Sequence, residues 1–183
     1  MQTLDIPQAN DLDTVRRVVH AVWRDCKTIE AIEDWTQYSR RHVQYRLHAA
    51  RVLGLVQMEG DEPLLTTMGE RLMDTARATA EERQLWARII EGCPVVQLVA
   101  PDLLGRTPPD IEDLTERLFK NSRLGAETAR RRASGLLAWR RHVLGESLEK
   151  APRHPATQPP PKPHGAPPEP GPTSAATQLD LFG

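Results

Sequence analysis

Residues Arg51–Met73 read RVLGLVQMEGDEPLLTTMGERLM, which places two short apolar runs between a glycine and a helix start. Leu55–Glu59 has the pattern of a strand, Gly60–Glu62 supplies turn residues, and Pro63–Thr66 has the pattern of a second strand. A helical pattern restarts at Thr67. This stretch therefore predicts a β-hairpin followed by a helix.

Upstream of the hairpin, the spacing of apolar residues predicts three helices. The first runs from Leu12 to Cys26 with apolar residues three and four apart. Thr28 is placed to cap a second helix that ends near Trp35, and Ser39 to cap a third that ends at Gly54. The predicted order is helix, helix, helix, hairpin, helix.

That order and the motifs around the hairpin resemble the winged helix-turn-helix family. Ala-Arg-x-Leu-Gly-Leu-Val before a short hairpin, then Leu-Thr-x-x-Gly-Glu-Arg-Leu, recurs in many bacterial members, and Ala50–Leu72 carries both motifs. The resemblance covers residues 12–75 and implies a DNA-binding domain. Winged helices also serve as protein–protein modules, so the resemblance alone leaves the partner open.

Residues 80–146 read as a second, helical region with an arginine-rich last helix. Helices are predicted over Ala80–Glu91, Asp110–Phe119 and Ala126–Leu144, while Val95–Val99 fits a strand or a helix. A short helix, a turn and an arginine-rich helix occur here as they do upstream, which leaves open a second helix-turn-helix. Four tryptophans on apolar faces are predicted to be core: Trp23, Trp35, Trp86 and Trp139.

Residues 147–177 form a Pro-rich stretch that we expect to be a disordered linker. Ten of the sixteen prolines fall between Pro152 and Pro172, where no apolar side chain is larger than alanine. Such a composition buries too little apolar surface to offset the entropy of folding. The apolar residues that follow, in 178–183, are therefore predicted to be held by a partner.

The sequence Gln178-Leu179-Asp180-Leu181-Phe182 resembles the bacterial sliding-clamp-binding motif, Gln-Leu-(Ser or Asp)-Leu-Phe, at all five positions. The resemblance implies that Leu181 and Phe182 enter an apolar pocket of the clamp. It implies that Gln178 fixes the register by hydrogen bonds and that Leu179 makes a secondary contact. An affinity on the order of micromolar is expected for so short a peptide.

Positive charge is concentrated on two predicted helices, although the formal net charge of the chain is only −1. Ser39–Leu53 contains four arginines and no carboxylate, and three arginines are adjacent at 130–132. Arginine, glutamine, tyrosine and histidine side chains can contact bases or phosphates. The residues predicted to contact DNA are Arg40, Arg41, Gln44, Tyr45, His48, Arg51, Arg130, Arg131, Arg140 and Arg141.

The hairpin tip is acidic, with Glu59, Asp61 and Glu62, and it should repel phosphates. The expected function is therefore a DNA-binding adaptor tethered to the replication clamp, acting in replication, repair or mobile-element maintenance. Two alternatives remain: a winged-helix transcriptional regulator, and an accessory or recognition subunit of a nuclease or ATPase. The acidic tip favours the accessory subunit over the regulator.

No catalytic constellation stands out, so we expect a protein that is not an enzyme. Cys26 and Cys93 form no metal or disulfide pattern, and the histidines are scattered. No phosphate-binding glycine loop and no signal or membrane segment is apparent. No metal, cofactor or membrane partner is therefore expected, and the predicted location is cytoplasmic, associated with the nucleoid.

Overall fold

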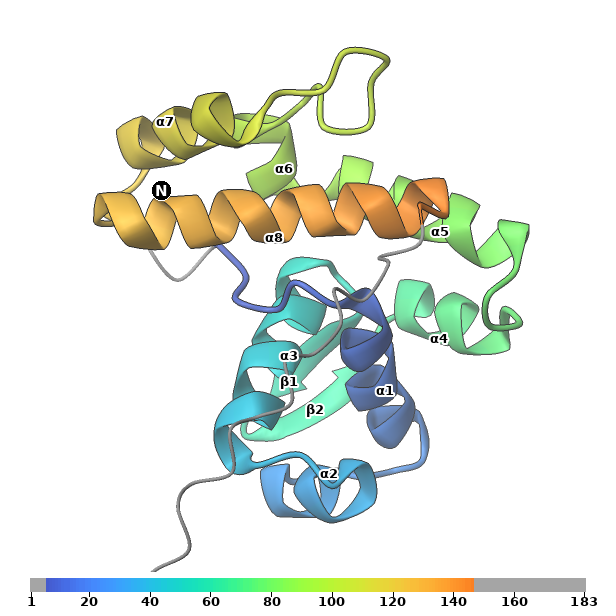
Figure 1. Cartoon of the computed structure of the whole chain (residues 1–183). Coiled ribbons are helices and arrows are strands. Elements are labelled where there is room, and N and C mark those ends of the chain that lie inside the picture. Colours follow the sequence, from blue (N-terminus) through green and yellow to red (C-terminus); the bar gives the residue numbers. More distant parts are fainter. Residues whose placement is uncertain (1–5, 147–183) are drawn as a thin grey trace, which may run out of the picture. The chain divides into compact units, whose positions relative to one another are not determined.

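Eight helices and one two-stranded hairpin follow one another in residues 6–146, the part of the chain that this computed structural model describes (Figure 1). The mainly helical fold is thereby confirmed for these residues. The predicted linker 147–177 and the clamp-binding peptide 178–183 lie outside the described residues. The elements are α1 Leu12–Trp23, α2 Ile29–Thr36, α3 Arg40–Val52, β1 Val56–Glu59, β2 Glu62–Leu65, α4 Thr67–Asp74, α5 Ala80–Gly92, α6 Pro94–Val99, α7 Ile111–Asn121 and α8 Ala126–Leu144.

Side-chain caps fix the starts of the first two helices. Asp11 accepts a hydrogen bond from the Asp13 amide at 2.9 Å, and Thr28 accepts one from the Ala31 amide at 3.1 Å. Ser39 precedes α3 but makes no side-chain cap bond, contrary to the prediction. Helix α1 ends at Trp23 rather than Cys26, because Asp25 adopts a left-handed φ of 66°.

The hairpin and α4 are joined by the threonine–glycine pair that the sequence motif contains. The Thr66 hydroxyl donates to the Gly54 carbonyl at 2.6 Å and accepts from the Gly69 amide at 3.1 Å. A Cβ at Gly69 would lie 2.2 Å from the Leu55 carbonyl oxygen, so only glycine permits this approach of α4 to β1. Close packing of α4 therefore requires the glycine of the motif Leu-Thr-x-x-Gly in this protein.

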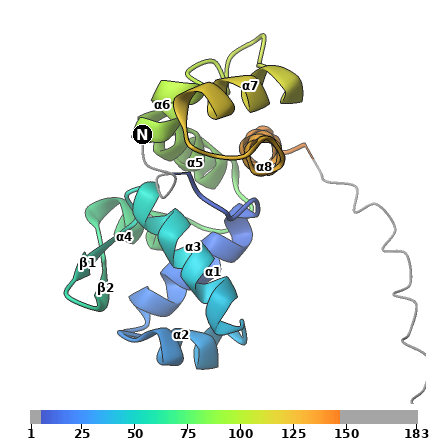
Figure 2. The ribbon, with the colours of Figure 1, turned by 90° about the vertical axis from the view of Figure 1, so that its left-hand side faces the viewer.

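Helix α8 packs against both α5 and α7 (Figures 1 and 2). Its bounds agree with the predicted ones. Residues 94–99, which fitted either a strand or a helix, form helix α6, with Pro94 at a first-turn position that suits proline. The α7 helix begins after Asp110, whose side chain accepts from the Asp113 amide at 2.7 Å.

The N-terminal segment before α1 packs against α8. Ile6 is buried, and the Trp139 indole nitrogen donates to the Ala9 carbonyl at 2.9 Å. Trp86 and Trp139 are both fully buried, as predicted. Ile6, Pro7 and Ala9, which precede α1, are therefore buried with the core. Residues 6–146 belong to one compact unit.

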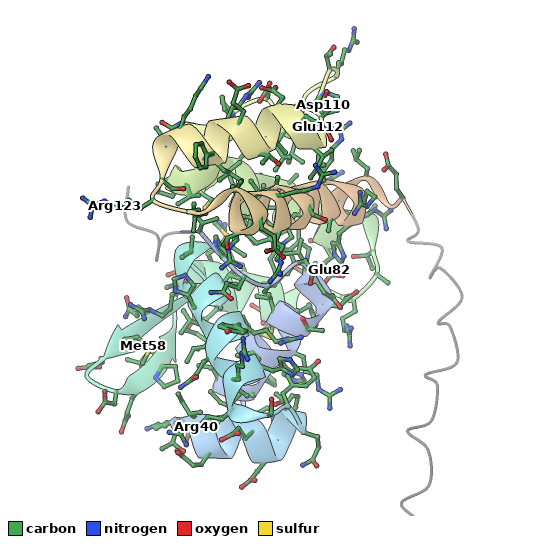
Figure 3. All side chains as sticks on the ribbon, turned by 60° about the vertical axis from the view of Figure 1, so that its left-hand side comes forward. Arg40, Met58, Glu82, Asp110, Glu112 and Arg123 are labelled. Atoms are coloured by element: carbon green, nitrogen blue, oxygen red, sulfur yellow. The ribbon has the colours of Figure 1, made fainter. Side chains whose placement is uncertain are left out.

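A buried ion pair joins α1 to α5. The Arg16 Nε atom lies 2.8 Å from Glu82 Oε1, and both side chains are less than a tenth exposed (Figure 3 labels Glu82). Arg16 also donates to the Leu72 and Thr75 carbonyls at 3.0 and 2.7 Å, while Glu82 accepts from the Ala78 amide at 2.6 Å. Burial lowers the pKa of Arg16, and the carboxylate of Glu82 opposes that shift.

Three large aromatic side chains lie outside the core, and the prediction that Trp23 and Trp35 are core was wrong. Trp23 is 48% exposed, Trp35 37% and Phe119 53%. Trp23 is the last residue of α1, and the chain turns away at Asp25 before anything covers the ring. On α2, Ile32 is buried and Trp35 lies at the edge of that face.

Candidate nucleic-acid interface

The outward face of α3 holds six of the ten residues predicted to contact DNA. Val43, Leu47 and Ala50 point into the core, which leaves the predicted positions on the other side of the helix. Arg40, Arg41, Gln44 and Arg51 are exposed, while Tyr45 and His48 are half-buried. The structure thus brings these six together on one helix.

Arg40 is paired with carboxylates, which corrects the expectation that no acid neutralises this face. Its guanidinium contacts Glu30 and lies 3.9 Å from Glu33, both on α2 (Figure 3). The Glu30 backbone and then Arg40 hold the pKa of Glu30 below its usual value. The acids were missed because they are ten and seven residues away in sequence and meet Arg40 only when α2 packs on α3.

Arg41 and Tyr45 form a preorganised pair on the same face. The Arg41 Nε donates to the Tyr45 hydroxyl at 2.8 Å, and the guanidinium carbon lies 5.3 Å from the Tyr45 ring centre. Neither Arg41 nor Arg51 forms an ion pair with a carboxylate of residues 6–146. Both guanidinium groups are therefore available to phosphates or base edges.

The four predicted contacts on α8 divide into two groups at opposite ends of the helix. Arg130 lies 3.4 Å from Glu112 on α7, and Arg131 pairs with Glu127. Arg140, about 15 Å further along the axis, donates to the Leu103 and Gly105 carbonyls at 2.8 and 3.1 Å. Arg141 is half-buried beside it. Arg140 therefore holds the segment between α6 and α7.

A polar pocket of about 590 Å³ lies between α8 and the N-terminal segment. Arg131 and Arg132 line it together with Gln8 and Asn10. Arg132 was not singled out from the sequence, since it is one of three adjacent arginines and only the fold distinguishes them. Burial lowers its pKa, and its Nε has no hydrogen-bond partner within the described residues.

The hairpin tip exposes its three carboxylates. Glu59 pairs across the hairpin with Glu62, and both residues and Asp61 are exposed. None of the three forms an ion pair with a cation of residues 6–146. The tip is thus an acidic projection, as the sequence indicates.

The sequence did not indicate a row of aromatic and arginine side chains on α1, α2 and the loop before α3. Trp23 and Trp35 lie on either side of His20, and Arg17 lies near both Trp35 and Tyr38. Helical spacing placed both tryptophans on apolar faces, so no periodic signal distinguished them from core residues.

Residues 6–146 contain no group of three His, Cys, Asp or Glu side chains arranged to hold a metal ion. No helix among them combines the length and the apolar character that a bilayer span requires. Comparisons with protein-family models, curated proteins and solved structures return no match. The resemblance to the winged helix-turn-helix family therefore depends on the sequence motifs in Ala50–Leu72 and on the order of the elements.

Proposed function

We propose that this chain is a non-enzymatic adaptor that binds DNA through α3 and a bacterial sliding clamp through Gln178–Phe182. The match of all five motif positions carries the proposal, because it specifies one partner and one binding chemistry. The arrangement of α3 supports the DNA contact. The two contacts together would keep the protein on DNA that a clamp encircles.

The element order supports a winged helix-turn-helix over residues 12–75. Helices α1, α2 and α3 precede the hairpin β1–β2, and α4 follows it. In that family the third helix enters the major groove. Helix α3 offers Arg41, Gln44 and Arg51 for this contact, and the paired Arg41 and Tyr45 side chains are already ordered for it.

The clamp contact follows from the chemistry of the peptide. Leu181 and Phe182 would each contribute about 1.5–3 kcal/mol if fully buried in a pocket. The composition of residues 147–177 predicts a semi-extended tether with a reach on the order of 50–100 Å. That reach would let one chain hold DNA and the clamp at once, which raises the effective affinity of each contact.

The acidic hairpin tip supports a second candidate, an accessory subunit that docks on a protein. Glu59, Asp61 and Glu62 are exposed and would repel phosphates that approached the hairpin. In this alternative the hairpin contacts a basic surface of a nuclease or ATPase.

Titration against purified sliding clamp tests the proposal. Four proteins are compared: the full chain, a version that ends at Ser174, the double variant Leu181→Ala/Phe182→Ala, and Thr177→Ala. We expect micromolar or tighter binding by the full chain and by Thr177→Ala, which leaves the motif intact. The other two should not bind. No binding by the full chain would reject the adaptor and favour the accessory subunit.

A further inference from the structure

Two of the four tryptophans are exposed on neighbouring helices. Trp23 on α1 is 48% exposed and Trp35 on α2 is 37% exposed, whereas Trp86 and Trp139 are buried. Large exposed indoles that gather on one surface indicate a binding surface, because the same rings would stabilise the fold if they were covered.

A histidine connects the two indoles into one row of rings. The His20 ring centre lies 5.4 Å from that of Trp23 and 4.9 Å from that of Trp35. The planes are tilted by 41° and 75°, so the rings do not stack on one another face to face. The exposed parts of Trp23 and Trp35 therefore remain for a ligand to contact.

Arginines border the rings at every position. The guanidinium carbon of Arg24 lies 5.9 Å from the Trp23 ring centre, and that of Arg17 lies 5.9 Å from Trp35 and 5.5 Å from Tyr38. We call these six residues the aromatic–arginine patch: Arg17, His20, Trp23, Arg24, Trp35 and Tyr38. Neither arginine of the patch forms an ion pair within residues 6–146.

The charged side chains that act on His20, between the two indoles, are arginines. Burial lowers the pKa of His20, and the charges of Arg16, Arg24 and Arg77 lower it further. Two carboxylates of α1 and the turn after it are paired with cations: Asp13 lies 3.3 Å from Arg77, and Asp25 lies 3.6 Å from Lys27. A ligand for this surface should carry negative charge as well as a flat apolar face.

An unpaired nucleotide combines those two properties. Its base can stack on an indole, and its phosphate can pair with an arginine beside the ring. Stacking of a base on an aromatic side chain contributes about 1–3 kcal/mol without regard to sequence. A purely apolar protein partner would fit poorly, because cations lie against the rings.

The patch is continuous with α3. The guanidinium carbon of Arg46, on α3, lies 4.7 Å from the Tyr38 ring centre, and that of Arg17 lies 5.5 Å from the same ring centre. A strand that leaves a duplex held by α3 would thus meet the patch. We propose that the aromatic–arginine patch binds unpaired bases of single-stranded DNA, and, resting on the proposed function of α3, that the protein recognises junctions between duplex and single strand.

Intrinsic tryptophan fluorescence tests the proposal on the full chain. An oligothymidylate of about twelve nucleotides should quench part of the emission in a saturable way, because only Trp23 and Trp35 are exposed. Trp86 and Trp139 should keep their emission. No quenching by the oligothymidylate would overturn the inference.

Variants then locate the contact with an end-labelled oligothymidylate. Trp23→Leu/Trp35→Leu keeps apolar side chains but removes both ring faces, and it should lower the affinity at least about tenfold. Phe119→Leu is the matched control, because Phe119 is equally exposed on α7, and its affinity should not change. An equal loss in both variants, or none in the double variant, would contradict the proposal.

Measuring duplex binding and oligothymidylate quenching on the same variant separates this inference from the proposed function. Arg41→Ala/Arg51→Ala should weaken duplex binding and leave quenching by oligothymidylate in place. If duplex and clamp binding fail but quenching persists, the patch still binds single strands and only the junction preference is lost. Binding of polyglutamate in place of oligothymidylate would overturn the inference and assign the patch to an acidic protein.

Discussion

Helices α3 and α8 look alike in the sequence, since both are rich in arginine and poor in acid. Their arginines nevertheless make different contacts. On α3, Arg41 and Arg51 face solvent without an ion pair in the described part of the chain. On α8, Arg130 and Arg131 contact carboxylates, and Arg140 donates to two carbonyls. The comparison teaches that charge density alone does not locate a binding surface.

The difference follows from what lies opposite the arginines of each helix. Helix α8 packs between α5 and α7 and also covers the N-terminal segment, so most of its sides meet another part of the chain. Helix α3 packs against α1, α2 and β1 and keeps one side open. An arginine that faces carboxylates or carbonyls of its own chain finds partners inside the fold, and one on an open side keeps its donors for another molecule.

Arg16, on α1, is buried, unlike the arginines of α3 and α8. Its replacement should therefore have the largest effect on stability. Arg16→Ala leaves the Glu82 carboxylate buried without its partner, so the free energy of unfolding should fall by about 3–5 kcal/mol. Arg17→Ala changes the adjacent but exposed residue and should cost less than about 1 kcal/mol. Urea unfolding measures both. Equal, small losses would mean that burial does not distinguish the two arginines.

The open side of α3 gives the next prediction. Arg41→Ala/Arg51→Ala should weaken duplex binding by about 1–3 kcal/mol and flatten its salt dependence. The free energy of unfolding should change by no more than about 0.5 kcal/mol. The control is Arg88→Ala, an exposed arginine on α5 with no ion pair in residues 6–146. If this control weakens binding equally, the contact is non-specific.

Arg140 should behave in the opposite way. Arg140→Ala removes both hydrogen bonds to the α6–α7 segment, so the free energy of unfolding should fall by about 1–2 kcal/mol. Duplex affinity, measured by anisotropy of a labelled oligonucleotide, should stay unchanged. A variant with full stability and weak DNA binding would return Arg140 to the interface.

Arg130 and Arg131 should give the smallest effect. Their exposed ion pairs contribute about 0–1 kcal/mol to stability, and DNA would have to displace Glu112 and Glu127. Arg130→Ala/Arg131→Ala should therefore reduce the salt slope of duplex binding by less than the α3 variant does. A larger reduction would place the main phosphate contacts on α8.

Local signals predicted the elements well. The cap at Thr28, turn glycines and apolar spacing depend on residues close in sequence, and helix α8 has its predicted bounds. Partners that meet across the fold could not be predicted in this way. Arg16 and Arg17 are adjacent, but one is enclosed by α4 and α5 and the other lies over aromatic rings. The exposed tryptophans were missed for the same reason.

The adaptor requires that DNA and clamp contacts act together, and the affinity of the full chain for a clamp that encircles primed DNA measures this directly. We expect binding roughly tenfold or more tighter than to the free clamp, with that gain lost in Arg41→Ala/Arg51→Ala. Equal affinity for the free and the DNA-encircling clamp would contradict the account, because the two contacts would then not cooperate.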